Sequence, residues 1–188
     1  MKIGTHCLSF VVAACVLSGG QWVFSQTVNN EPRFVTLQAR RKTDVQDNYV
    51  EAAFSFEHGV NGKEALRITH NDWDLLFGNS FVADTFDVTM VTDDCSRIKD
   101  LGEFGWYDSF KVPVLPAHDK PTREPSVRAV VGHMYVVHTK DRETDLYALF
   151  RVEALEPGTS VTISWKRVPP PENEPQDTNS PPAGRENF

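Results

Sequence analysis

Short segments in which apolar and polar residues alternate recur along the second half of this chain. In residues 146–152 every second side chain is apolar, and the same spacing returns in residues 161–165. A period of two places such side chains on one face of a β-strand. No amphipathic helix longer than two turns is visible in the pattern. The chain is therefore predicted to be an all-β protein.

The strongest strand signal lies in residues 126–139, whose centre, Met134–Val137, is apolar at every position. Such a strand is predicted to be central and covered on both faces. It continues through a polar tip at residues 140–145 into an antiparallel partner. Residues 98–126 hold Gly102, Gly105 and four prolines, so we expect a loop with at most short edge strands. Further strands are expected at 34–40, 50–57, 66–69, 85–92 and 160–166. These many short strands predict a single antiparallel β-sandwich or barrel-like domain, and the sequence does not decide between the two.

Four parts follow one another along the chain. Residues 1–25 have the order of a signal peptide: Lys2, an apolar run over residues 7–17, and small residues before Gln26. Residues 26–32 are polar and predicted to be loose. The β domain is expected at 33–168. Residues 169–188 hold six of the twelve prolines and little to bury, so a disordered tail is predicted.

The same N-terminal stretch predicts the location of the protein. The apolar run is too short to span a bilayer, so the mature chain is expected to be exported, periplasmic or extracellular, with no transmembrane span. Val12-Ala13-Ala14-Cys15 also resembles a lipobox. Cys15 would then carry a lipid anchor, and this alternative stays open.

The charge balance excludes one class of partner. The chain has 26 acidic and 19 basic residues, for a net charge of −7. Nucleic acids and anionic membranes are bound by clustered Lys and Arg, and the longest basic run is residues 40–42. No nucleic-acid partner is predicted.

Aromatic residues stand beside glycine in the long loop, in Phe104-Gly105-Trp106-Tyr107. Rings in an exposed loop can stack on a glycan or a peptide, although such clusters also serve as buried anchors of a loop. Phe104, Trp106 and Tyr107 are the candidate ligand-binding residues.

Metal binding has one local candidate. Asp141, Glu143 and Asp145 alternate in the predicted hairpin tip, where carboxylates could converge on a hard cation. A charged tip that keeps the hairpin soluble is the competing interpretation. His133 and His138 are five residues apart on one predicted strand, so they point to opposite faces and cannot share a metal without a β-bulge between them. No cofactor is predicted.

Two further groups of residues have side chains that could carry chemistry. Asp72, Asp74, Asp84 and Asp87 lie near Trp73, and paired carboxylates beside aromatic rings are what a glycoside hydrolase uses. No residue is assigned a catalytic role on this ground. Cys95 follows two aspartates, which raise the pKa of a thiol, so an inert or half-buried thiol is expected.

Parts of the chain resemble known exported proteins. Gly132–Thr139, Asp145–Val152, Phe86–Thr89 and Thr92–Asp94 resemble segments of small exported proteins from planctomycete-type bacteria, an uncharacterised group. Phe54–Glu57, Trp73–Phe77 and the late hairpin are similar to exported β-domains of the HmuY-like haem-binding type. The resemblances imply an exported β fold, and neither supplies a haem-ligand pair in this sequence.

The function predicted from the sequence is an exported, non-catalytic module that binds a protein, a glycan or a small ligand through its loops. A haem- or metal-binding protein is the alternative, and a glycoside-type hydrolase is a further one.

Overall fold

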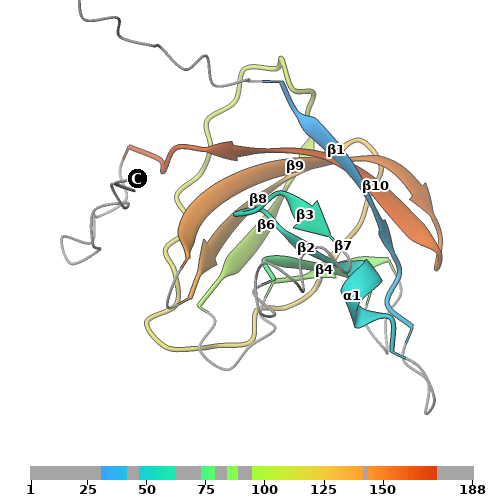
Figure 1. Cartoon of the computed structure of the whole chain (residues 1–188). Helices are drawn as coiled ribbons and strands as arrows, with labels where there is room; N and C mark the ends of the chain where they lie inside the picture. Colours follow the sequence, from blue (N-terminus) through green and yellow to red (C-terminus); the bar gives the residue numbers. More distant parts are fainter. Residues whose placement is uncertain are drawn as a thin grey trace, which may run out of the picture.

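The computed structural model describes residues 31–41, 47–61, 73–78, 84–88, 95–141 and 144–172. These residues form two antiparallel β-sheets of five strands each, and Figure 1 shows the two sheets packed as layers. The all-β prediction is confirmed, and the arrangement is that of a sandwich.

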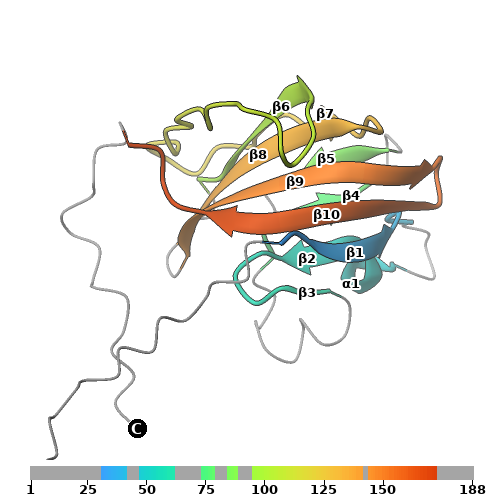
Figure 2. The ribbon, with the colours of Figure 1, turned by 90° about the horizontal axis from the view of Figure 1, so that it is seen from above.

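The first sheet, here called the long sheet, contains the longer strands. Neighbouring strands in it are hydrogen-bonded, and Figure 2 looks onto its outer face. In spatial order its strands are β1 (Arg33–Gln38), β10 (Ser160–Val168), β9 (Asp145–Glu156), β8 (His133–Lys140) and β6 (Arg97–Glu103).

The second sheet, here called the short sheet, has strands of only two or three described residues. In spatial order they are β3 (Val60–Asn61), β2 (Ala53–Ser55), β4 (Leu75–Phe77), β5 (Thr85–Asp87) and β7 (Val127–Arg128). One helical turn, α1 (Tyr49–Ala52), precedes β2.

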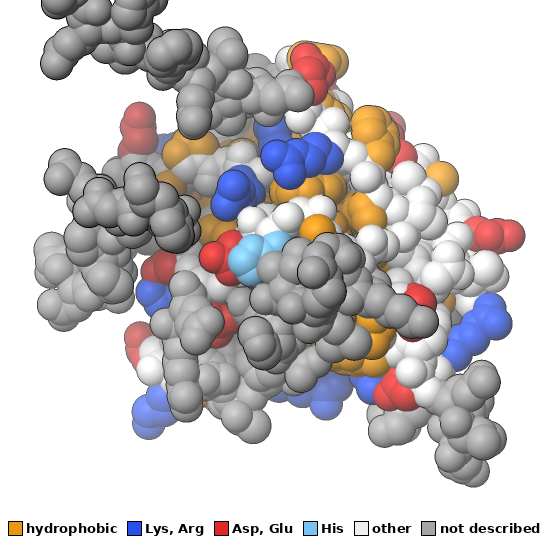
Figure 3. Space-filling model, viewed as in Figure 1, with side chains coloured by type: hydrophobic (Ala, Val, Ile, Leu, Met, Phe, Trp, Pro, Cys, Tyr) orange, Lys and Arg blue, Asp and Glu red, His pale blue; other side chains and the backbone are white. Residues whose placement is uncertain are grey.

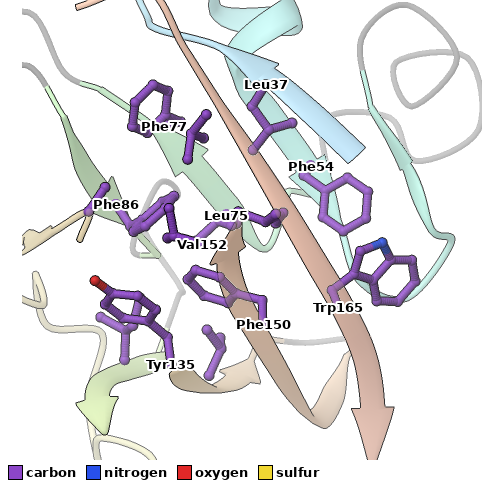
Figure 4. Close-up of a cluster of buried hydrophobic side chains, with 14 of the residues drawn as sticks. Leu37, Phe54, Leu75, Phe77, Phe86, Tyr135, Phe150, Val152 and Trp165 are labelled. Carbon is purple, nitrogen blue, oxygen red and sulfur yellow. The ribbon is translucent and has the colours of Figure 1, made fainter. Parts of the chain in front are cut away.

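Aromatic side chains from both sheets fill the space between the layers. Tyr135 of β8 stacks on Phe150 of β9 with ring centroids 4.9 Å apart. From the short sheet, the ring of Phe86 meets Phe150 edge-on at 4.9 Å. Trp165 meets Phe54 at 5.1 Å in the same way, and Figure 4 shows these rings converging from opposite layers. Packing of this kind holds the two sheets together.

The inward faces predicted from the alternation are confirmed for β1, β9 and β10. The residues predicted to face inward all belong to this core or pack against it: Val35, Leu37, Ala39, Leu146, Ala148, Phe150, Val152, Val161, Ile163 and Trp165.

The prediction for β8 is also confirmed. Tyr135 and Val137 belong to the core between the sheets. Met134 and Val136 lie in a second cluster on the outer face of the long sheet, which the loop after β6 covers. The strand has a neighbour on each side, so it is central within its sheet.

Two segments differ from the expected strands. Residues 49–52 form a helical turn in which the amide N–H groups of Glu51 and Ala52 donate to the carbonyl of Asn48. Asn48 fixes this turn because its side chain also bonds the backbone of Ala39 and Arg41. In addition, β6 is a seven-residue edge strand, longer than predicted. It accommodates Gly102 at a register shift, with a φ of 90° that suits glycine.

Several predictions fall outside the described residues. These are the signal peptide at residues 1–25, nearly all of the loose segment, the strand at 66–69, and the tail beyond Glu172. No helix among the described residues is long and apolar enough to cross a membrane.

Replacing Phe150 with alanine is expected to destabilise the protein by about 3–5 kcal/mol, because the ring contacts both layers and leaves a cavity. Phe34→Ala removes the same atoms from a side chain that is 67% exposed, so a change within about 0.5 kcal/mol is expected there. Urea unfolding of both variants measures the difference, and similar losses for the two would contradict the packing described.

Candidate functional site

The loop between β6 and β7 lies across the outer face of the long sheet. Its apolar side chains pack on the outward-facing residues of β8 and β9, and Figure 2 shows the loop on this side of the strands. The cluster consists of Leu115, Met134, Val136, Tyr147 and Leu149, with Leu101, Phe104, Trp106, Phe110, Val112 and Val168 packed against it. The outer face of the sheet is thereby shielded from water.

Polar contacts hold the first half of the loop. The guanidinium of Arg151 donates to the carbonyl oxygen of Phe104 at 2.9 Å. Near the middle of the loop, the Leu115 carbonyl accepts from His138 Nδ1 at 2.6 Å and from the Tyr147 hydroxyl at 3.0 Å. The loop is therefore fixed to the sheet between these points.

Two of the three predicted ligand-binding residues are anchors of this loop. Phe104 is half-buried, and its ring lies 5.1 Å from that of Phe110. Trp106 is half-buried, and its indole N–H donates to Ser164 Oγ at 2.7 Å. The ammonium of Lys166 lies 5.0 Å from the centre of the Trp106 ring, within range of a cation–π interaction. Their packing explains why these rings occur in the loop.

Tyr107 differs from its neighbours because its side chain is 89% exposed. Its hydroxyl donates to the carboxylate of Glu31 at 3.3 Å. Because Trp106 is anchored on β10, the next residue is held above the sheet. Tyr107 therefore presents its ring to solvent from a fixed position.

A second exposed ring lies nearby, at Phe34 of β1. Phe34 is 67% exposed and lies opposite Ser164, the residue that accepts the Trp106 indole N–H. Side chains of directly opposed residues project from the same face of a sheet. Phe34, Trp106 and Tyr107 therefore share one end of the outer face, and we call these three residues the aromatic surface.

Phe34 was not among the candidates drawn from the sequence, although a signal for it exists. Val35, Leu37 and Ala39 were predicted to face the core, so Phe34 falls on the opposite face by alternation. A large apolar side chain on the solvent side of an edge strand is a candidate for a contact surface when other exposed rings lie beside it. Its proximity to Trp106 depends on strand pairing, which the sequence does not show.

The predicted metal ligands take part in the hairpin itself. Asp141 Oδ1 accepts from the backbone N–H of Thr144 at 2.7 Å. Asp145 lies opposite Lys140 across the hairpin, forms an ion pair with Lys140, and contacts His138 Nε2 at 3.0 Å through Oδ1. Burial raises the pKa of Asp145, but the hydrogen bonds with Lys140 and His138 together outweigh it and hold this pKa below its usual value. Glu143 lies outside the described residues, among which no group of three or more His, Cys, Asp or Glu side chains is placed to hold a metal.

Asp74 is the most unusual of the carboxylates weighed for acid–base chemistry. Its side chain is 1% exposed, and burial raises its pKa to about 6. One oxygen accepts from Ser55 Oγ and from the amides of Phe56 and Glu57, at 2.5 to 3.2 Å. The other accepts from Thr139 Oγ1 at 2.7 Å. Asp74 therefore joins the turn after β2 to β8 in the opposite sheet.

The other carboxylates of that group also bond to the fold. Asp84 accepts the backbone N–H of Gly158 at 2.8 Å, and Asp87 accepts the Ser126 hydroxyl. Asp72 lies outside the described residues. The contacts of Asp74, Asp84 and Asp87 are those of structural residues, and they do not form a pair across an open site.

The described histidines lie beside carboxylates. His118 contacts Glu124 at 2.8 Å, His133 contacts Asp100 at 3.0 Å, and His138 contacts Asp145 at 3.0 Å. His133 and His138 come from opposite ends of β8. Cys95 is half-buried, as expected, and its amide donates to the Lys140 carbonyl.

Comparisons with protein-family models, with curated proteins and with solved structures find no match to this chain. The two resemblances noted in the sequence remain predictions. The functional argument therefore depends on the geometry of the aromatic surface.

The elevated pKa of Asp74 predicts a specific dependence of stability on pH. The folded state holds the proton more tightly than the unfolded chain, so the Asp74 contribution is fully present below the unfolded pKa, near 4. It is lost as the pH rises through about 6. From pH 4 to pH 7.5 this amounts to about 2–3 kcal/mol.

Asp74→Asn keeps the size of the side chain and removes the titration. We expect the stability difference between wild type and variant to change by that amount in favour of the variant as the pH rises. Urea unfolding at half-unit steps of pH measures it. A difference that does not vary with pH would contradict the burial of this carboxylate.

Proposed function

We propose that this protein is an exported, non-catalytic binding module whose ligand, a protein or a glycan, contacts the aromatic surface. The observation that carries the proposal is the exposure of Tyr107 and Phe34, 89% and 67%, on one face of a rigid sheet. Exposed rings that are held in place bind at low cost in conformational entropy. Export is inferred from the N-terminal sequence.

The surroundings of the aromatic surface favour recognition of a partner by shape and polarity. Lys166 and Ser164 lie beside Trp106, and Glu31 lies beside Tyr107. Apolar rings with polar groups at their margin are typical of contact surfaces. Figure 3 shows another face of the molecule, on which acidic and basic side chains are scattered without a large patch of one sign.

The alternatives receive less support from the described residues. A hydrolase needs two carboxylates across a site that admits substrate, whereas Asp74 is buried and bonded by four donors. A haem or metal protein needs ring nitrogens turned toward the ligand. Both nitrogens of His138 contact oxygen atoms of the protein, and one nitrogen each of His118 and His133 contacts a carboxylate.

Binding partners can be found by screening the wild-type protein against a glycan array and against peptides of the proteins secreted by the producing cell. The double variant Phe34→Ala/Tyr107→Ala is expected to weaken binding of any true ligand at least tenfold, because ring contacts at interface centres exceed about 1.4 kcal/mol. Unfolding in urea should show that the variant remains as stable as the wild type.

Val131→Ala is the matched control. Val131 is 54% exposed in the turn before β8, so it is also an apolar side chain on the surface, but it is separated from β1 by other strands of the sheet. The Val131→Ala variant should bind the ligand with the same affinity as the wild type. Ligands that bind the double variant and the wild type equally would refute the proposal.

A further inference from the structure

We propose that the chain's own proline-rich segment, beginning at Pro169, docks on the aromatic surface and competes with the external ligand. This inference rests on the proposed function and names the chemistry that the surface recognises, an extended polyproline II segment. Such a segment binds aromatic side chains without forming a core or a hydrogen-bonded ladder. It is therefore compatible with the composition that predicts disorder for residues 169–188.

The path of β10 delivers this segment beside the aromatic surface. Lys166 lies over the Trp106 ring, and Val168, the last residue of β10, packs against the same outer cluster as Trp106. Three consecutive prolines follow directly. At about 3.1 Å per residue, they span roughly 9 Å in the polyproline II conformation. The prolines therefore begin within reach of the rings.

Strand pairing also places Tyr107 near the C-terminal end of β10. Arg33 of β1 lies opposite Trp165 of β10, and Glu31, which bonds the Tyr107 hydroxyl, comes two residues before Arg33. Tyr107 is thus near the end of β10 at which the chain leaves the sheet. Pro171 is half-buried, whereas Pro169 and Pro170 are exposed. The rings of Tyr107 and Phe34 are exposed, so they are open to the residues that follow.

Charge also favours this occupant. Glu172, Glu174 and Asp177 are the charged residues that follow the three prolines, before a single arginine at position 185. The charged residues that end β10 are Lys166 and Arg167, both basic. Of these, Lys166 lies over the Trp106 ring and attracts the acidic residues to this face, whereas Glu31 beside the Tyr107 hydroxyl opposes them.

Tethering makes a weak contact effective. A short tether that can span the distance gives an effective concentration of roughly millimolar order, so a site with millimolar affinity for a polyproline segment would be occupied for about half of the time. The apparent affinity for an external ligand falls in proportion to the fraction of open surface. Release of the segment is therefore expected to tighten ligand binding about twofold or more.

The test uses the full chain labelled with 3-fluorotyrosine, whose ¹⁹F spectrum reports on each tyrosine. Tyr107→Phe identifies the Tyr107 signal, and Tyr135 and Tyr147, which are buried, serve as internal references. The variant Pro169→Ser/Pro170→Ser/Pro171→Ser/Pro175→Ser is expected to shift the Tyr107 signal and leave those of Tyr135 and Tyr147 in place. Asn173→Ser/Asn179→Ser keeps all the prolines and should match the wild type.

A synthetic peptide of residues 169–182, added to the proline variant, is expected to restore the wild-type Tyr107 signal in a saturable manner. The wild-type signal should not change over a hundredfold dilution, because the contact is within one chain. A signal that changes with dilution would assign the site to the tail of a second copy and overturn the inference. An unchanged Tyr107 signal in the proline variant would overturn it as well.

The two proposals fail separately in these experiments. If Tyr107 does not respond to the prolines but Phe34→Ala/Tyr107→Ala still weakens an external ligand, only the docking of the tail is wrong. If Tyr107 responds and no ligand depends on the double substitution, the module function is wrong and the surface serves the tail alone.

Discussion

Both faces of the long sheet must be shielded from water, and the rest of the structure depends on this constraint. The sheet's central strands are apolar on both sides, so one sheet packed against them would leave half of that surface in water. The short sheet covers the inner face through Phe86, whose ring meets Phe150 of the stacked pair Tyr135–Phe150 edge-on. The loop after β6 covers the outer face through Phe104, Trp106 and the residues around them. The loop is thus a third layer of the fold, without regular secondary structure.

The connection between the sheets also has a polar component. Asp74 of the short-sheet side accepts four hydrogen bonds, of which one comes from Thr139 in the long sheet. Glu57 and Thr144 bond across the same end of the sandwich. A buried carboxylate with neutral donors keeps a raised pKa, because the donors offset only part of its desolvation. These directional bonds fix which turn of one sheet lies over which strand of the other, and apolar packing alone would specify this less sharply.

The sequence was informative wherever burial follows a regular period. Alternation placed Leu37, Phe150 and Ile163 on the core face correctly, and the unbroken apolar run at Met134–Val137 identified the strand that is covered twice. It failed where side-chain bonds to the backbone decide the local structure. The turn at Tyr49–Ala52 follows the contacts of Asn48, and β6 continues past Gly102 through an irregularity in its pairing. Similarly, the candidate aromatic residues were found from composition, but their division into anchors and an exposed ring depends on Ser164, a residue 58 positions from Trp106.

This division links folding and recognition within one short segment. Phe104 and Trp106 bury apolar surface of the sheet, and the free energy gained holds the loop in one conformation. Because the loop is fixed, the backbone of Tyr107 has a defined place on the face that carries Phe34, so binding orders the Tyr107 side chain but not the loop. Loss of the Trp106 anchor would therefore weaken recognition even if Tyr107 were unchanged. The same argument explains why the three candidate residues, Phe104, Trp106 and Tyr107, are neither all buried nor all exposed. An exposed ring in a loop can recognise a ligand only if its neighbours are anchored.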